Sequence, residues 1–208
     1  MLIAALIVEM VVPGGRPTSI DQALRALGLR APSWWALAAA MLAGVLLIVL
    51  MWSYGAATNT TITVRPDALW LAVGLVAQGG VAEEVVFRGF LFRRLRLTRS
   101  FWRAAGLAAI PFVVVHSILF LTLDFVVALA SLILSLLISF PLAWLFERAG
   151  NSVWPPALVH AVIQGAIKVV EAEPSRFQGL ALFWMGVSAA VPYLFFFLRP
   201  SAGTTAPR

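Results

Sequence analysis

The sequence predicts an all-α, polytopic transmembrane helix bundle of about six to seven spans around a polar intramembrane cavity. Hydrophobic residues make up 62% of the chain and charged residues only 12%, about half the charged fraction of a soluble domain. The apolar stretches are long enough for membrane-crossing helices rather than barrel strands. One of these stretches nevertheless carries Glu83, Glu84 and Arg88. Ionisable groups at such a depth mark wet cavities or polar partners.

The first 32 residues are expected to form a short apolar segment followed by an interfacial helix. Residues 1–12 are apolar but short for a span, contain Glu9 and lack the basic start of a signal peptide. Further on, Ser19 and Asp21 precede apolar residues at positions 23, 24 and 27. This spacing predicts a short amphipathic helix that begins near Ser19.

Residues 33–198 are expected to form one transmembrane domain, followed by a disordered tail at 199–208. The predicted spans are residues 33–54, 67–92, 104–123, 125–146, 155–170 and 177–198. Trp and Tyr side chains stand at both ends of the first span, as in an aromatic belt. Pro111 is expected to break the third span and Pro141 to kink the fourth, whereas Pro155 and Pro156 open the fifth, where proline is tolerated. Between the spans we expect polar loops at 55–66, 147–152 and 171–176, and Asp67 is expected to cap its helix.

The arginine distribution predicts the orientation. When the spans alternate, eleven of the fifteen basic residues fall on one face and three, Arg65, Lys168 and Arg176, on the other. The positive-inside rule then places the 93–103 loop and the C-terminus in the cytoplasm, and we expect a multi-pass protein of a prokaryotic plasma membrane. The net charge of +6 is explained by this signal, so the bilayer is the predicted partner and nucleic acid is not. The sequence has no cysteine, which excludes disulfides and thiolate catalysis.

The charged residues within the second span divide into a pair and a single carboxylate. Glu84 and Arg88 are four residues apart with the acid first, so they are expected to pair along one helix face. Glu83 is rotated by about 100° from Glu84 and lacks that partner. This arrangement is typical of a carboxylate that is available for chemistry, Glu83, next to one with a structural role, Glu84.

Both histidines of the sequence, His116 and His160, fall in spans other than the one with Glu83. Gln164 lies one helical turn after His160, on the same face. A rise of about 1.5 Å per residue places all of these groups in or near the inner half of the bilayer, with His116 the deepest. One cytoplasm-facing cavity can therefore hold them. Taken singly, each is more often a helix-packing residue than a catalyst.

The order of these motifs resembles a known family. The motifs Glu83-Glu84-x-x-x-Arg88, Phe112-x-x-x-His116 and His160-x-x-x-Gln164 resemble those of the CPBP family, intramembrane proteases related to the CAAX prenyl endopeptidase and also called the ABI family. The resemblance extends over roughly residues 67–198. It implies transmembrane helices around a polar cavity and hydrolysis of a peptide bond in a peptide or lipidated protein tail.

The resemblance also implies roles for individual residues. Glu83 would be the base that activates water, helped by His116, and His160 with residue 164 would stabilise the oxyanion. Glu84 and Arg88 would support the carboxylate helix. The family's usual residue at the last position is Asn, sometimes Asp, whereas Gln164 is one methylene longer. Since oxyanion donors need close placement, this departure bears directly on activity.

Several alternatives stay open at this point. Glu83, His116 and His160 also form a plausible three-ligand set for Zn²⁺ with an open fourth position, although no HExxH motif is present. A second hypothesis is a catalytically degenerate scaffold or immunity protein without protease activity, with Gln164 as the mark of lost function. A proton-coupled transporter is disfavoured because the chain is small and has no visible inverted repeat. Neither the substrate nor the oligomeric state is assigned.

Overall fold

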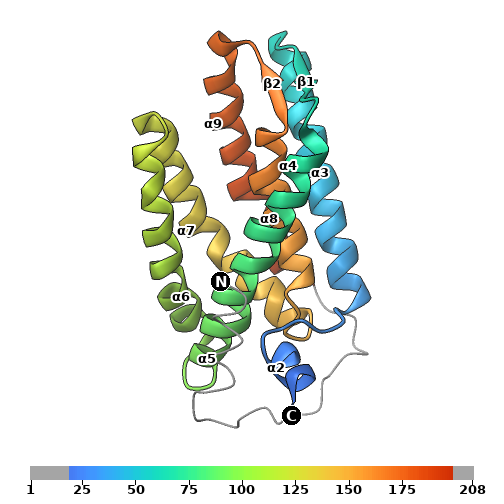
Figure 1. The fold of residues 1–208 in the computed structure, drawn as a ribbon, viewed down its shortest axis with the longest axis vertical. Helices are drawn as coiled ribbons and strands as arrows, with labels where there is room; N and C mark the ends of the chain where they lie inside the picture. Colours follow the sequence, from blue (N-terminus) through green and yellow to red (C-terminus); the bar gives the residue numbers. More distant parts are fainter. Residues whose placement is uncertain (1–18, 199–208) are drawn as a thin grey trace.

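The structure is a computed structural model, and it describes residues 19–198. Within this range five helices are long and apolar enough to cross a membrane: Trp34–Thr58, Ala68–Arg96, Phe101–Leu121, Phe125–Arg148 and Pro174–Phe197. They form an elongated bundle (Figure 1). The predicted all-α polytopic bundle is confirmed. The expectations for residues 1–12 and for the 199–208 tail lie outside the described residues.

Helix α3 (Trp34–Thr58) follows directly from its sequence, a run of 25 residues without a charged side chain. Its small residues Ala36, Ala40 and Ala43 are buried and, with Leu47 and Met51, form the stripe that faces the bundle. The opposite face is exposed, as expected for lipid contact. The helix ends at Asn59, which adopts the left-handed conformation with φ 53°, a position that Asn tolerates better than most residues.

The helix that carries the carboxylates is continuous but contains two π-helical segments. It begins as α4 (Ala68–Leu75), widens into the π-helical segments η1 (Val76–Ala82) and η2 (Val85–Phe92), and ends as α5 (Arg93–Arg96). Wide turns inside α-helices are rare and occur frequently at functional sites. Here they bracket the Glu83-Glu84 pair.

The prediction that Asp67 caps this helix is wrong. Asp67 occupies the position before α4 but makes no capping hydrogen bond. Its carboxylate instead accepts hydrogen bonds from the Arg65 guanidinium, at 2.9 Å from Nε. A charged donor two residues away competes better for the carboxylate than the backbone amides do, since charge-assisted hydrogen bonds are the stronger kind.

Helix α6 (Phe101–His116) corrects another expectation. It runs through Pro111 without interruption and changes only after His116, where it tightens into the 3₁₀ segment η3 (Ser117–Leu121). Helix α7 (Phe125–Arg148) then packs back along α6, and its Pro141 is buried inside a continuous helix. Helix α7 begins at Asp124, whose carboxylate accepts a hydrogen bond from the Val126 amide at 2.9 Å.

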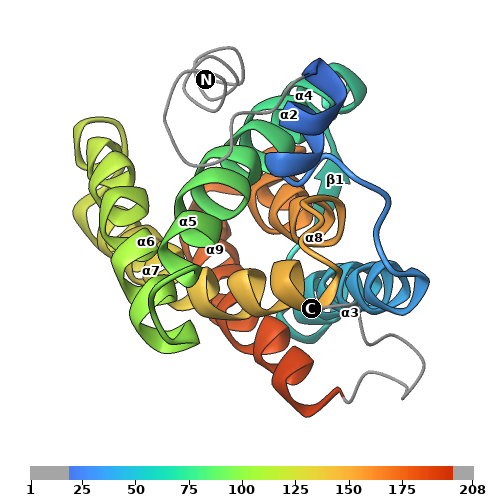
Figure 2. The same ribbon diagram turned by 90° about the horizontal axis from the view of Figure 1, so that it is seen from below.

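Helix α8 (Trp154–Gly165) begins at the predicted prolines but is shorter than expected. After twelve residues it passes into the 3₁₀ turn η4 (Ala166–Lys168) and a strand, β2 (Val170–Ala172). Eight of its twelve residues are buried, and Figure 2 shows it enclosed by α3, α7 and the 68–96 helix. The predicted segment over 155–170 is therefore a shorter helix than expected, although it still runs from the α2 end of the bundle to the strands at the opposite end.

Two predicted loops contain strands. Strand β1 (Ile62–Val64) pairs antiparallel with β2, with Ile62 opposite Ala172 and Val64 opposite Val170. The β-branched run Ile-Thr-Val is typical of a strand, but three residues are too few to show an alternating pattern. The two-stranded sheet closes the end of the bundle at the top of Figure 1.

The predicted amphipathic helix is confirmed as α2 (Ile20–Ala26), with Ser19 accepting a capping hydrogen bond from the Gln22 amide. Its Ala23 is buried, and Leu27 just beyond it is also buried, at the end of the bundle opposite the strands. Gly89 allows this docking, because a Cβ at that position would overlap the Leu27 carbonyl. The bundle is completed by α9 (Pro174–Ala190), which continues into the 3₁₀ segment η5 (Val191–Phe197).

Candidate functional site

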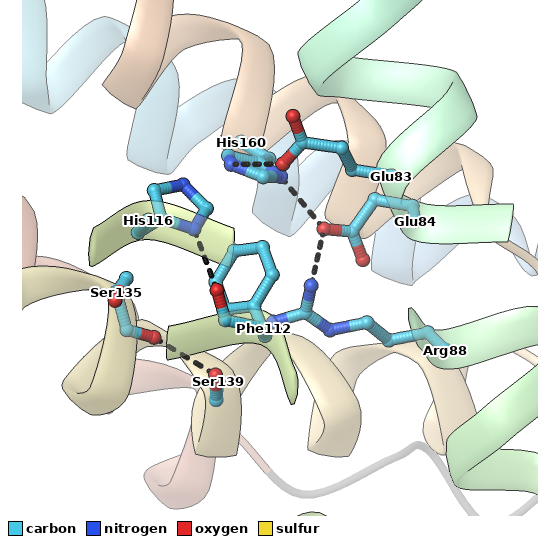
Figure 3. A network of polar contacts seen from close by, with 8 residues as sticks. All are labelled: Glu83, Glu84, Arg88, Phe112, His116, Ser135, Ser139 and His160. Atoms are coloured by element: carbon cyan, nitrogen blue, oxygen red, sulfur yellow. Dashed lines mark hydrogen bonds and ion pairs between the residues drawn. The ribbon is translucent and has the colours of Figure 1, made fainter. Parts of the chain in front are cut away.

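The centre of the site is the carboxylate of Glu84, which is completely buried. One of its oxygens, Oε1, accepts a hydrogen bond from Arg88 Nη1 at 2.9 Å and another from His160 Nδ1 at 2.8 Å (Figure 3). The predicted pairing of Glu84 with Arg88 is confirmed. The contact with His160 joins α8 to the 68–96 helix and was not predicted.

This contact determines which ring nitrogen of His160 carries hydrogen. An ionised carboxylate only accepts hydrogen bonds, so Nδ1 is the donor to Glu84. The other ring nitrogen, Nε2, faces Glu83 and lies 3.9 Å from its Oε2. That separation is too long for a hydrogen bond. Glu83 Oε2 has no hydrogen-bond partner among the described residues, although it is buried.

Phe112 is the aromatic contact that joins the charged groups. The Arg88 guanidinium lies over its ring at 4.7 Å from the centroid, within the range of a cation–π interaction. The same ring meets the imidazoles of His116 and His160 edge to face, at centroid distances of 4.5 and 5.7 Å. Arg88 is only 3% exposed, so this aromatic face and Glu84 replace water around a fully buried cation.

His116 is the last residue of α6 and comes from the third helix of the site. Its Nδ1 lies 2.7 Å from the Phe112 carbonyl oxygen. Because a carbonyl oxygen only accepts, Nδ1 donates, and in the neutral ring Nε2 is left as an acceptor. His116 is partly buried and lies within electrostatic range of Glu83 and His160. Figure 3 shows it beside both residues.

Gln164 is brought to the same helix contact by a pair of glycines. A Cβ on Gly79 would overlap the Gln164 side-chain amide, and a Cβ on Gly80 would lie 3.1 Å from the Ala157 carbonyl. Helix α8 therefore packs against η1 at backbone distance. Gln164 Oε1 is buried without a hydrogen-bond partner in the described part of the chain. The glycine pair was missed at the sequence level, although small residues at helix contacts are a known signal.

The arrangement does not form a ready-made metal site. Within residues 19–198 no group of three or more His, Cys, Asp or Glu side chains is placed to hold a metal ion. The Nδ1 atoms of both histidines donate to protein acceptors, which leaves their Nε2 atoms as the ring nitrogens that could bind a metal ion. The expectation of a Zn²⁺ ligand set stays a prediction.

The fold and the site together define a polytopic membrane protein with a polar intramembrane centre. Helices of membrane-spanning length surround a buried cluster of carboxylates, a guanidinium and imidazoles. The family model described as type II CAAX prenyl endopeptidase Rce1-like matches residues 65–166, just under half of the chain. This match confirms the resemblance predicted from the motifs, and it includes every candidate site residue. The chain thus carries a segment, residues 65–166, that is similar to the Rce1-like family of type II CAAX prenyl endopeptidases. No curated protein and no solved structure matches this chain.

Proposed function

We propose that this chain is an intramembrane endopeptidase that hydrolyses a peptide bond in a membrane-presented peptide or protein tail, prenylated tails included. The observation that carries the proposal is the approach of Glu83, whose buried Oε2 makes no hydrogen bond, to the free Nε2 of His160 with His116 beside them. Three separate helices supply these groups. A set brought together across the fold in this way supports a common reacting centre better than any one motif does.

In the proposed reaction Glu83 acts as the general base. Its unpartnered oxygen accepts a proton from a water molecule, whose oxygen then attacks the substrate carbonyl carbon. The same proton is later passed to the leaving amine as the tetrahedral intermediate collapses, so the carboxylate is regenerated. His116 assists because the free Nε2 of its neutral ring is a second acceptor for the attacking water. Its Phe112 hydrogen bond holds the ring in that tautomer.

His160 and Gln164 are proposed to stabilise the oxyanion. To donate from Nε2 while Nδ1 donates to Glu84, the His160 ring must be doubly protonated. The buried set then contains two carboxylates, one guanidinium and one imidazolium, and its net charge is zero. Buried charges are tolerated when they are paired in this way. Gln164 would contribute one amide N–H, and Gly79 leaves the space for its longer side chain.

The test is cleavage of fluorogenic peptides, with and without a prenyl group, by the purified chain in lipid nanodiscs. Glu83→Gln, His116→Ala and His160→Ala should each lower kcat by about 10²–10⁴-fold, the usual contribution of acid–base groups. Glu173→Gln is the control, since Glu173 is an exposed carboxylate at the end of the bundle near the strands. If one of the three variants keeps wild-type activity, the role given to that residue is wrong.

The second candidate function is the degenerate scaffold or immunity protein, and the observation that favours it is Gln164 in place of the family's Asn. In that case no peptide is cleaved, and Glu83→Gln leaves the biological function intact. Complementation of a deletion phenotype by Glu83→Gln, together with inactive wild-type protein in the peptide assay, would support the scaffold.

We further propose that the 93–103 loop lies in the cytoplasm of a prokaryotic cell. The concentration of arginine in this loop supports the orientation. Because the chain has no native cysteine, single cysteines at Thr98 and Ser175 can be labelled in intact cells with a membrane-impermeant maleimide. The orientation requires that only the Ser175 position reacts.

A further inference from the structure

One nitrogen of the buried Arg88 guanidinium has no role in the contacts described above. Its Nη1 donates to Glu84, and the group lies over the Phe112 ring. Its Nη2 is also buried, but it makes no hydrogen bond with any residue of 19–198. A cationic N–H group without an acceptor destabilises an apolar interior, so this nitrogen is expected to have a partner.

Arg88 lines a small cavity between η2, α6 and α7. The cavity has a volume of about 10 Å³, which is close to the least space that one water molecule needs. Ser139 of α7 is the other polar residue on its wall. The remaining wall is apolar and consists of Phe87, Phe92, Ala105, Ala108, Ala109 and Ala143. The small alanine side chains thus leave room for a single water beside a charged group.

The two polar residues of this cavity face it without touching each other. Figure 3 shows the guanidinium end of Arg88 directed toward the side of the site where Ser139 lies. Arg88 Nη2 nevertheless makes no direct hydrogen bond to Ser139. Polar groups that are separated in this way are commonly bridged by an ordered water, whereas cavities that stay dry have entirely apolar walls.

The hydrogen-bond directions around the cavity also fit a water molecule. The hydroxyl of Ser139 donates to the Ser135 carbonyl at 2.8 Å, so its oxygen lone pairs remain free to accept. The Arg88 guanidinium can only donate. A ligand between them must therefore accept from Arg88 and donate to Ser139, and water does both.

We propose that this cavity is the binding site of one internal water molecule, which bridges Arg88 Nη2 to Ser139 Oγ. The bridge ties the helix of the two carboxylates to α7 and fixes the guanidinium that holds Glu84. It supplies the acceptor that the second amino group of the buried cation needs. The inference does not depend on the proposed peptidase function, because it concerns the support of Glu84 and not the groups around Glu83.

The direct test is a crystal structure of the full chain in a lipidic mesophase, at a resolution that shows ordered water. We expect one water within hydrogen-bond distance of both Arg88 Nη2 and Ser139 Oγ. In Ser139→Val the water should be lost, because a methyl group replaces its acceptor. A direct hydrogen bond between Arg88 and Ser139, the absence of water density beside Nη2, or a water that stays in Ser139→Val overturns the proposal.

The second test measures thermal unfolding of two variants that have the same shape. Ser139→Thr keeps the hydroxyl and Ser139→Val lacks it, so the difference in Tm between them reports the hydroxyl alone. We expect Ser139→Val to unfold roughly 2–12 °C below Ser139→Thr, because a buried cationic N–H then loses its bridged acceptor.

The same two substitutions at Ser135 are the matched control. Ser135 is also buried on α7, and its hydroxyl likewise donates to a carbonyl of its own helix, that of Leu132, at 2.8 Å. It does not line the cavity, so its Thr and Val variants should differ less in Tm than those of Ser139. An equal difference at the two positions would mean that both hydroxyls serve only their own helix, and the bridge to Arg88 would be refuted.

Discussion

Glu83 and Glu84 are neighbours in sequence, but their surroundings predict opposite responses to the same isosteric substitution. Glu84 is completely buried and accepts two charge-assisted hydrogen bonds, from Arg88 and His160. Glu84→Gln leaves the buried Arg88 guanidinium without a counter-charge. Removing one partner of a buried pair costs about 3–5 kcal/mol, and two charge-assisted hydrogen bonds at about 1.5–3 kcal/mol each give a similar sum. For a chain of this size the loss corresponds to a decrease in Tm of roughly 6–20 °C.

Glu83→Gln removes a carboxylate that makes no hydrogen bond with any described residue. We therefore expect Glu83→Gln to lower the free energy of unfolding less than Glu84→Gln does, because no hydrogen bond is lost, while peptide cleavage is lost. Both variants are measured by thermal unfolding in one detergent, with cleavage assayed on the same preparations. The reasoning is refuted if Glu84→Gln unfolds at the wild-type temperature, or if Glu83→Gln is destabilised as strongly as Glu84→Gln.

Three further predictions follow from other contacts. Gly79→Ala should displace the Gln164 amide and lower kcat by about 10²–10³-fold, the usual cost of one oxyanion donor. Gly74→Ala in the same helix is the control, because a Cβ at that position has no neighbouring atom within 4 Å. Equal activity of the two variants would contradict the role given to Gln164. EDTA or phenanthroline tests the predicted Zn²⁺ set: inhibition that added Zn²⁺ reverses would show that a metal takes part, and unchanged cleavage would show that Glu83 acts without one. Arg96→Gln should lower the free energy of unfolding by no more than about 1 kcal/mol, since the ion pair of Arg96 with Glu147 is partly exposed. A larger loss of stability, measured by thermal unfolding, would mean that this pair anchors α5 to α7.

Several confirmed predictions depend on short-range interactions, although the local predictions for Asp67 and Pro111 were wrong. The Glu84–Arg88 pair and the start of α8 at Pro155 were predictable because each depends on residues within one or two helical turns. The membrane-spanning helices were likewise predictable, since hydropathy acts on each segment without reference to its neighbours. Helix α8 ends earlier than predicted because the chain passes into β2, whose pairing with β1 depends on residues far away in the sequence.

The sequence by itself determined that this is a helical membrane protein, which motifs it carries, and which polar residues stand at membrane depth. Only the tertiary structure decided how those residues meet. The His160 contact with Glu84 joins residues 76 positions apart, and the β1–β2 pairing brings Ile62 to Ala172. The approach of Gln164 to Gly79 likewise depends on how closely two helices pack. No local pattern encodes such distances, because they result from the packing of whole helices against one another.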